Sequence, residues 1–272
     1  MLRNELEEST QVLTNMRVAA MNAGYALLDL QPDATIVDKE DKDFLTTADT
    51  LSEEIIFKIL KKEYPDIPAF SEEAGGEAKT SGYLWVIDPL DGTVGYFHQS
   101  RDRWGVSIAL VKDGITKIGV VFLPGRGELF EATVSIASRA WKTSRDITLN
   151  TERSIKVSQQ KRELSRCHFL MDWGKTDPEL FLKRLGNLRA KSLYPATTMC
   201  CTSGLIDVAQ GYYPGYALIP PDPFDIAAAG LIAEKAGATV TTLEGATWSP
   251  FAKSIVVSNG LVHSELLAIL NS

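Results

Sequence analysis

The sequence predicts a mixed protein in which an α+β half is followed by an α/β half. Apolar residues recur at helical spacing in residues 5–30 and again after Thr50, and strand-like segments dominate residues 84–133. Beyond residue 153, helical and strand patterns alternate. The polar segment 134–153 has the weakest pattern and separates the two parts. We therefore expect an N-terminal half over residues 1–145 and a C-terminal half over residues 146–272.

The first half begins with two predicted helices. The first covers residues 5–30 and ends near Pro32, and a loop or weak hairpin follows over residues 33–48. Thr50-x-x-Glu53 has the pattern of a capping box, so we expect the second helix to begin there and to end before Pro65. A short apolar strand, Ile67 to Phe70, and an acidic loop over residues 71–82 come next.

Strands and helices then follow in a regular order. We expect strands at 84–88, 104–111, 115–123 and 128–133, with turns at Asp113-Gly114 and at Pro124 to Gly127. In the second half we expect strands at 167–171, 191–194, 238–242 and 254–258, and helices at 177–187, 202–210, 225–236 and 262–270.

The composition restricts the partners and the compartment. The chain has 272 residues, is 44% hydrophobic and has a formal net charge of −7 with no long basic run, so we expect neither a nucleic-acid polymer nor a membrane surface as partner. It contains no apolar run long enough to span a membrane and no apolar leader segment. Its three cysteines form no Cys-x-x-Cys pair, which favours a reducing, cytoplasmic location.

The stretch Trp85 to Thr93, W-V-I-D-P-L-D-G-T, carries the clearest chemical signal. A buried strand stops at Asp88, and Asp91 follows just before a Gly-Thr turn. Two carboxylates this close repel each other unless a cation lies between them. The chain has only three histidines, none paired at ligand spacing, so we expect oxygen ligands and a magnesium, manganese or calcium ion.

Other acidic residues also lie at the ends of predicted elements. Asp49 precedes the second helix, Glu72 and Glu73 follow a short strand, and Asp225 opens an Ala-rich helix. Each has a simpler interpretation, because Asp49 and Asp225 can be plain helix N-caps and the glutamates a solvated loop pair. Their convergence on Asp88 and Asp91 would favour a metal or phosphate site instead.

W-V-I-D-P-L-D-G-T resembles the D-P-[IL]-D-G-T signature of the inositol monophosphatase family. Four further blocks are similar to family segments in the same order: F-L-T-T-A-D, S-E-E, W-G-V-S-I-A-L, and P-F-D-I-A-A-A-G followed by E-K-A-G-A. The resemblance implies a layered αβαβα sandwich of the inositol monophosphatase and fructose-1,6-bisphosphatase type. It also implies a Mg²⁺-dependent, lithium-sensitive phosphatase of small phosphorylated metabolites, and a homodimer.

Carried over position by position, the resemblance implies a centre of two or three Mg²⁺ ions, with Mn²⁺ as an alternative. The metal ligands would be Glu72, Asp88, the Leu90 carbonyl, Asp91 and Asp225. The catalytic residues would be Asp49 and Thr93, which orient and deprotonate the attacking water, together with Glu72. Phosphate and substrate would contact Asp91, Gly92, Thr93, Leu218 and Asp225. The first half would thus supply most ligands, and the second half Asp225 and substrate contacts.

The sequence departs from the family mainly where substrate is bound. Leu218 stands where the inositol enzymes have a glutamate that contacts inositol hydroxyls, and Cys200 to Ser203 replace the usual Gly-Ser-Ala-Ala. Histidinol phosphate, a 3′(2′),5′-bisphosphate nucleotide and fructose 1,6-bisphosphate are therefore alternative substrates to inositol monophosphate. An inactive, metal-binding regulatory relative is the non-enzymatic alternative.

A haloacid-dehalogenase-type phosphatase is the rival enzyme class. Its motif, D-x-D-G-T, places an aspartyl nucleophile and its acid partner on one face. Here the spacing is D-x-x-D-G-T, one residue longer, and this interpretation leaves Glu72 and Asp225 without a role.

Overall fold

Helices and two main sheets alternate along the computed structural model, which describes residues 10–33, 36–38, 44–160, 163–174 and 177–272. The helices are α1 (Thr10–Leu30), α2 (Thr47–Glu63), α3 (Thr93–Phe97), α4 (Pro178–Lys191), α5 (Cys201–Ala209), α6 (Pro223–Lys235) and α7 (His263–Leu270). Within these described ranges, no helix combines the length and the apolar character that crossing a bilayer requires.

The strands form a large sheet, a small sheet and a separate pair. The large sheet has the order β3 (Ala69–Ser71), β4 (Tyr83–Asp91), β5 (Gly105–Lys112), β6 (Ile115–Leu123), β7 (Glu128–Thr133), β8 (Arg139–Ser144) and β9 (Thr148–Ser154). The small sheet has the order β10 (Leu170–Asp172), β11 (Gly215–Leu218), β13 (Ile255–Ser258) and β12 (Thr239–Thr241). The antiparallel pair is β1 (Ile36–Asp38) with β2 (Phe44–Thr46), inside the segment expected to be a loop or weak hairpin.

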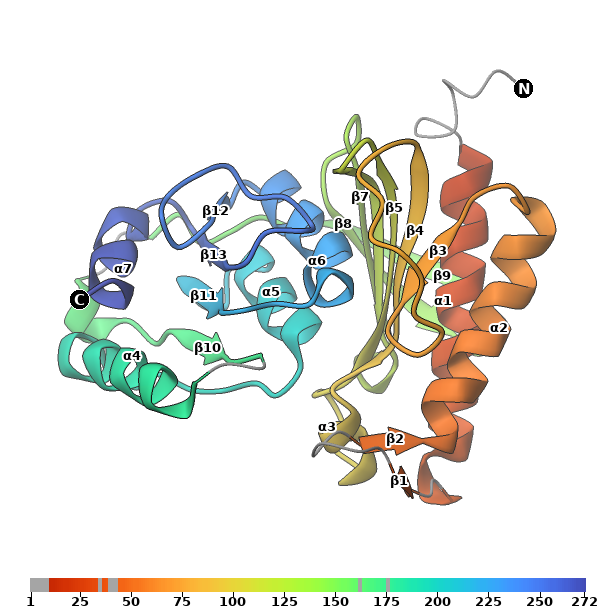
Figure 1. Ribbon diagram of the computed structural model, residues 1–272, viewed down its shortest axis with the longest axis horizontal. Coiled ribbons are helices and arrows are strands. Elements are labelled where there is room, and N and C mark those ends of the chain that lie inside the picture. Colours follow the sequence, from red (N-terminus) through yellow and green to blue (C-terminus); the bar gives the residue numbers. More distant parts are fainter. Residues whose placement is uncertain (1–9, 34–35, 39–43, 161–162, 175–176) are drawn as a thin grey trace.

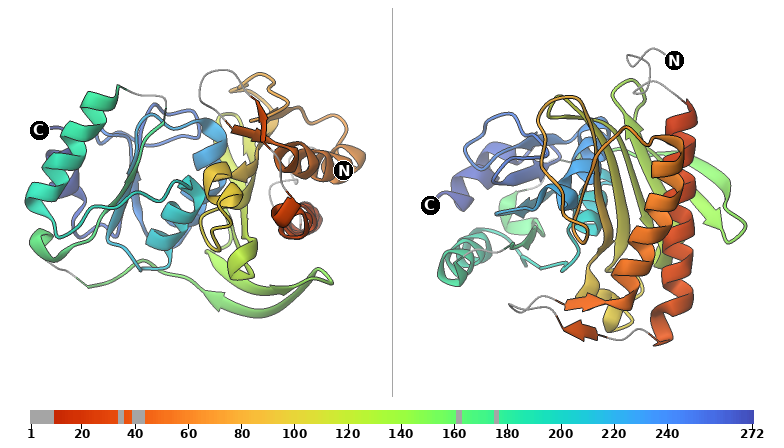
Figure 2. Two further views of the ribbon diagram at one scale, coloured as in Figure 1. Left: turned by 90° about the horizontal axis from the view of Figure 1, so that it is seen from below. Right: turned by 45° about the vertical axis from the view of Figure 1, so that its right-hand side comes forward.

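These elements stack in five layers. Helices α1 and α2 cover one face of the large sheet, and α5 and α6 lie between the two sheets (Figure 1). Helices α4 and α7 cover the far face of the small sheet (Figures 1 and 2). The αβαβα order confirms the layered sandwich that the resemblance implies. Both faces of the central strands of the large sheet are therefore buried, which explains the nearly continuous apolar sequence of β4 and β5.

The predicted turns are confirmed. Asp113 and Gly114 join β5 to β6 with φ values of 50° and 76°, the conformation that favours Asp-Gly in a tight hairpin. Gly127, with φ of 62°, closes the turn between β6 and β7. These two hairpins set the register of the large sheet.

The polar segment 134–153 is not a featureless separator. It forms β8 and most of β9, which extend the large sheet to Ser154. The sequence pattern does not show these strands because β9 is the edge strand and has no fully buried residue, so it lacks an apolar alternation. The division into halves at residue 145 stays a prediction.

Two local predictions were wrong. Helix α2 begins at Thr47, so Thr50 lies inside it and caps nothing, while Glu53 Oε1 instead accepts hydrogen bonds from Ser71 Oγ (2.5 Å) and Ala74 N (2.9 Å). No strand covers residues 191–194, because α4 continues to Lys191 and the apolar Tyr194 is 60% exposed. The strand that pairs with β10 is β11, which the sequence pattern did not predict.

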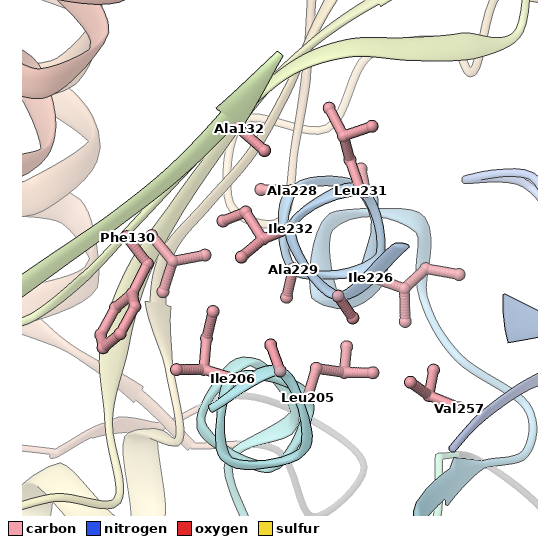
Figure 3. Close-up of a cluster of buried hydrophobic side chains, with 14 of the residues drawn as sticks. Phe130, Ala132, Leu205, Ile206, Ile226, Ala228, Ala229, Leu231, Ile232 and Val257 are labelled. Atoms are coloured by element: carbon pink, nitrogen blue, oxygen red, sulfur yellow. The ribbon is translucent and has the colours of Figure 1, made fainter. Parts of the chain in front are cut away.

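The second face of the large sheet packs closely on α6. Ala132 of β7 lies beside Ala228 of this helix, and the Phe130 ring of β7 extends down toward the level of α5 (Figure 3). A Cβ atom added to Gly119 of β6 would lie 2.7 Å from the Ala228 carbonyl oxygen. Only small residues allow backbones to approach this far, so the Ala-rich sequence of α6 fixes its distance from the sheet.

Polar bonds also tie α5 and α6 to the large sheet. Asp207 of α5 forms a 2.6 Å ion pair with Arg126 in the β6–β7 turn, and Lys235 Nζ at the end of α6 donates to the Val134 carbonyl at 2.7 Å. With the close packing at Gly119, these bonds fix the last turns of both helices against the large sheet.

Candidate metal centre

Four carboxylates from three parts of the chain converge at the end of β4. Asp88 and Asp91 belong to β4 itself, Glu72 directly follows β3, and Asp225 lies in the first turn of α6. The negative charges of Glu72, Asp91 and Asp225 all raise the pKa of Asp88. Carboxylate oxygens of Asp91 and Asp225 lie within 4.8 Å of each other. The expected grouping of acidic residues from distant segments is therefore present in the structure.

The end of β4 has an irregular backbone, which changes the direction of its side chains. The pairing register of β4 with β5 shifts between Asp88 and Asp91, and such a bulge turns side chains away from the regular alternation. Leu90 N donates to Asp88 Oδ1 at 3.0 Å, and Ser52 Oγ of α2 donates to the Pro89 carbonyl at 2.6 Å. The bulge is thus held from both sides.

Gly92 makes the next turn possible. Its φ is 84°, and an added Cβ atom would lie 2.3 Å from the Arg103 carbonyl oxygen. A side chain would suffer both backbone strain and a clash with the main chain there. The glycine lets the chain pass directly from Asp91 into α3, whose first residue is Thr93.

Asp91 is held by the first turn of α5. Its Oδ2 atom accepts hydrogen bonds from Thr202 N and Thr202 Oγ1, each 2.5 Å, and from Cys200 Sγ at 3.3 Å. Its Oδ1 atom accepts one from Cys201 N at 3.2 Å. The exposed N–H groups and positive end of a helix favour a carboxylate in this position. Sequence reasoning assigned Thr202 no role, although it noted residues 200–203 as a departure from the family.

Asp225 occupies the corresponding place on α6. Asp222 is the N-cap of this helix, and Asp225 Oδ2 accepts a 3.0 Å hydrogen bond from Asp222 N in a capping box. Asp49 is likewise the third residue of α2. Neither residue is the plain N-cap of the simpler interpretation. The first turns of three helices, α2, α5 and α6, therefore present acidic or acid-binding groups to one site.

The carboxylates are electrostatically unfavourable without a cation. Burial, and then the charges of Glu72, Asp91 and Asp225, raise the pKa of Asp88 well above its ordinary value. Burial, and then the charges of Asp91 and Glu72, do the same to the pKa of Asp225. Burial raises the pKa of Asp91 too, against the opposing effect of its bonds to Thr202. In the part of the chain that the structure describes, Asp88, Asp91 and Asp225 form no ion pair with lysine or arginine.

Asp49 and Thr93 form a polar pair beside the cluster. Thr93 Oγ1 lies 3.4 Å from Asp49 Oδ1 and 3.2 Å from the Leu90 carbonyl oxygen, either of which its single proton can reach. Asp49 is buried, with an exposed fraction of 1%. The two residues predicted to orient water are thus in contact with each other and, through Leu90, with β4.

The structure places Leu218 away from solvent. It lies in β11, its exposed fraction is 0%, and it packs in the apolar core between the sheets. A direct contact of this side chain with substrate stays a prediction that its burial does not favour.

The residues present suit a divalent cation with oxygen ligands. Buried carboxylates with raised pKa values and no cationic partner are stabilised when a metal ion supplies the missing charge. Carboxylate and backbone carbonyl oxygens are the ligands that Mg²⁺ and Mn²⁺ prefer. The sulfur of Cys201 lies in the same group of potential ligands, within 4.8 Å of the Asp91 and Asp225 oxygens.

Comparisons with known proteins find one family and several named relatives. The model of the inositol monophosphatase family matches residues 8–272. An inositol-1-monophosphatase from Synechocystis is 32% identical over 256 residues, covering 91% of this chain and 84% of the relative. A putative Nus factor SuhB from Neisseria meningitidis is 30% identical over 261 residues, covering 93% of this chain and 95% of the relative.

More distant relatives carry other names. A histidinol-phosphatase from Mycobacterium tuberculosis is 27% identical and covers 100% of this chain and 97% of the relative. Among solved structures, the extragenic suppressor protein suhB from Bartonella henselae superimposes with a TM-score of 0.83 at 27% identity, covering 97% of this chain and 99% of that one. Proteins named for different activities are therefore similar to this chain over nearly their whole length.

Proposed function

The chain belongs to the inositol monophosphatase family and is a phosphatase, and on this premise we propose that it hydrolyses a small phosphate monoester with Mg²⁺ ions bound by the β4 cluster. The observation that carries the proposal is the convergence of Glu72, Asp88, Asp91 and Asp225, with no lysine or arginine among the described residues paired to the three aspartates. When bound, the metal supplies Lewis-acid charge that offsets the phosphate oxygens and strengthens water as a nucleophile.

The protein's own groups would bind and orient the reactants. Glu72, Asp88, Asp91, Asp225 and the Leu90 carbonyl would hold the ions. The Leu90 carbonyl now accepts from Thr93 Oγ1. If a cation takes that carbonyl, the Thr93 hydroxyl keeps Asp49 as its acceptor, and it could pass its own proton to the Asp49 carboxylate as it takes one from the attacking water. The N–H groups of Gly92 and Thr93 would bind phosphate oxygens.

A substrate panel with Mg²⁺ tests the function. We propose inositol monophosphate as the first candidate, with histidinol phosphate, adenosine 3′,5′-bisphosphate and fructose 1,6-bisphosphate as the alternatives. Release of phosphate from one of them, abolished by EDTA and restored by Mg²⁺, is the expected result. The putative Nus factor is a relative of this chain, so absence of turnover on the whole panel would favour the inactive, regulatory alternative.

Neighbouring glutamates provide a matched pair of variants. Glu72→Gln removes a proposed ligand, so kcat should fall at least about 100-fold, comparable to removal of one strong charge-stabilising group. Glu73→Gln changes the adjacent carboxylate, and its kcat should stay within a few-fold of the wild type. Equal effects of the two substitutions would contradict the ligand assignment.

Three further properties are proposed from the family resemblance and the sequence. Lithium ions should inhibit turnover, and light scattering should give the mass of a homodimer. A cytoplasmic location agrees with Cys167, Cys200 and Cys201 all being free thiols. Activity that is unaffected by lithium or a monomeric mass would remove the corresponding property without affecting the phosphatase chemistry.

A further inference from the structure

Cys201 brings a sulfur atom into a cluster otherwise made of oxygen ligands. Potential ligand atoms of Asp91, Cys201 and Asp225 all lie within 4.8 Å of one another. We propose that Cys201 Sγ is a third protein ligand for an ion held by Asp91 and Asp225, and that this position accepts thiophilic divalent ions such as Zn²⁺, Co²⁺ and Cd²⁺ in competition with Mg²⁺. The inference rests on the metal centre of the proposed function.

The three groups come from three rigid elements. Asp91 ends β4, Cys201 is the first residue of α5, and Asp225 lies in the first turn of α6. Cys201 N donates to Asp91 Oδ1, so the backbone fixes the Cys201 position relative to this carboxylate. Cys201 and Asp225 are partly exposed, whereas Asp91 is buried. The Cys201 side chain also packs against the apolar core and its thiol interacts with the Tyr216 hydroxyl, so an ion bound by Asp91 and Asp225 would take the sulfur in place of this contact.

The neighbouring cysteine has a different role. Cys200 is fully buried, with an exposed fraction of 0%, and its thiol donates to Asp91 Oδ2. It is not part of the group of potential ligands that includes Asp225. Two adjacent thiols thus lie beside the same carboxylate, and only Cys201 also lies near Asp225.

The donor set explains which ions would compete. Mg²⁺ prefers oxygen ligands in octahedral geometry, whereas Zn²⁺ binds thiolate and carboxylate together in tetrahedral sites. Two carboxylates and one thiolate would give Zn²⁺ three protein ligands and leave one position open, as in catalytic zinc sites. On binding, the S–H bond breaks, its proton passes to water, and a metal–sulfur bond forms, with no change of oxidation state.

Cobalt titration of the metal-free protein tests the proposal. Co²⁺ bound to thiolate has a sulfur-to-metal charge-transfer band in the near ultraviolet, which oxygen ligands do not give. We expect this band in the wild-type protein and in Cys167→Ser, whose thiol is buried in the core around the small sheet. Cys201→Ser should lack the band. Cys200→Ser should keep the band, and this difference would show that Cys201, and not the adjacent Cys200, supplies the sulfur ligand.

Calorimetry supplies the second measurement. Loss of an outer-shell partner weakens metal binding about 10- to 100-fold, so loss of the sulfur ligand in Cys201→Ser should weaken Zn²⁺ binding at least as much while Mg²⁺ affinity changes little. Circular dichroism checks that the variant is folded, and ¹¹³Cd NMR of the wild type reports sulfur ligation without any substitution.

Two results would overturn the inference, and they differ. Co²⁺ that binds the wild type without the band, with equal affinity in Cys201→Ser, would refute sulfur ligation and leave the metal centre intact. Failure of Co²⁺, Zn²⁺ and Mg²⁺ to bind at all would refute both this inference and the proposed metal-dependent function.

Discussion

Asp225→Asn should stabilise the metal-free protein and destabilise the metal-loaded one. The oxygens of Asp91 and Asp225 lie within 4.8 Å. At an effective dielectric constant of about 20, two charges at that separation repel each other by about 3.5 kcal/mol. The native protein relieves part of this by taking up protons, since the pKa of Asp225 is raised. We therefore expect a gain of about 1–3 kcal/mol in the free energy of unfolding in EDTA at neutral pH.

The substitution preserves the local structure. The side-chain oxygen of the new asparagine can still accept the hydrogen bond from Asp222 N that closes the capping box. Mg²⁺ should reverse the order of stability, because a bound ion at about 100 times its dissociation constant would stabilise the wild type by about 2.7 kcal/mol. The variant lacks one charged ligand and should gain much less.

Thermal and urea unfolding in EDTA and in Mg²⁺ measure both effects. In EDTA the midpoint temperature of Asp225→Asn should lie roughly 2–8 °C above the wild type. Asp222→Asn is the control, because Asp222 is exposed and asparagine is an equally good N-cap, so stability should change by less than about 0.5 kcal/mol. A variant at Asp225 that is less stable than wild type in EDTA would refute the repulsion argument.

Three further predictions concern pH, the water-orienting pair and the packing of α6. The pKa values of Asp88 and Asp225 are raised in the folded state, so above pH about 4 the metal-free native protein binds more protons than the unfolded chain. The free energy of unfolding in EDTA should therefore fall as the pH rises through those pKa values. Urea unfolding in EDTA at several pH values measures this, and a free energy of unfolding that rises toward neutral pH would contradict it. Thr93→Val should lower kcat about 10²- to 10⁴-fold, while calorimetry should show an unchanged Mg²⁺ affinity. Thr93→Ser keeps a hydroxyl and should restore most of the rate. A normal kcat in Thr93→Val would exclude the hydroxyl from catalysis. Gly119→Ala should destabilise the protein by about 1–3 kcal/mol in urea, because its Cβ would meet the Ala228 carbonyl at 2.7 Å. Gly186→Ala is its control, since nothing lies within 4 Å of that added Cβ, and it should stabilise helix α4 by about 0.5–1 kcal/mol.

Much of the fold could be predicted from local pattern, where one face or both faces of an element are buried. The strands from β4 to β7, with their Asp-Gly and Gly-containing turns, are examples, and so are the Ala-rich helix α6 and the cluster at the end of β4. The acids stood out because each lies at the end of an element, their convergence was implied by the family resemblance, and the structure brings them together.

Features that depend on tertiary contacts were harder to predict. The β9 strand lies at an exposed sheet edge and has no apolar alternation. Only its pairing with β8 defines it as a strand. Thr50 and Glu53 match a capping box, but Glu53 bonds to the turn after β3 instead. Thr202 binds Asp91 only because α5 docks against β4, and no local signal in the sequence marks that contact.

The distribution of ligands along the chain has a consequence for synthesis. Asp49, Glu72, Asp88 and Asp91 leave the ribosome well before α5 and α6, which carry Thr202 and Asp225. Until then one apolar face of the large sheet has no covering helices, and Asp91 lacks the helix turn that holds it. Covering that face and completing the proposed ion site would therefore be the same event. A nascent or truncated chain that ends before α6 lacks Asp225, so it would not hold an ion through the complete set of proposed ligands, and retention of the ion would report that α6 has been made and packed.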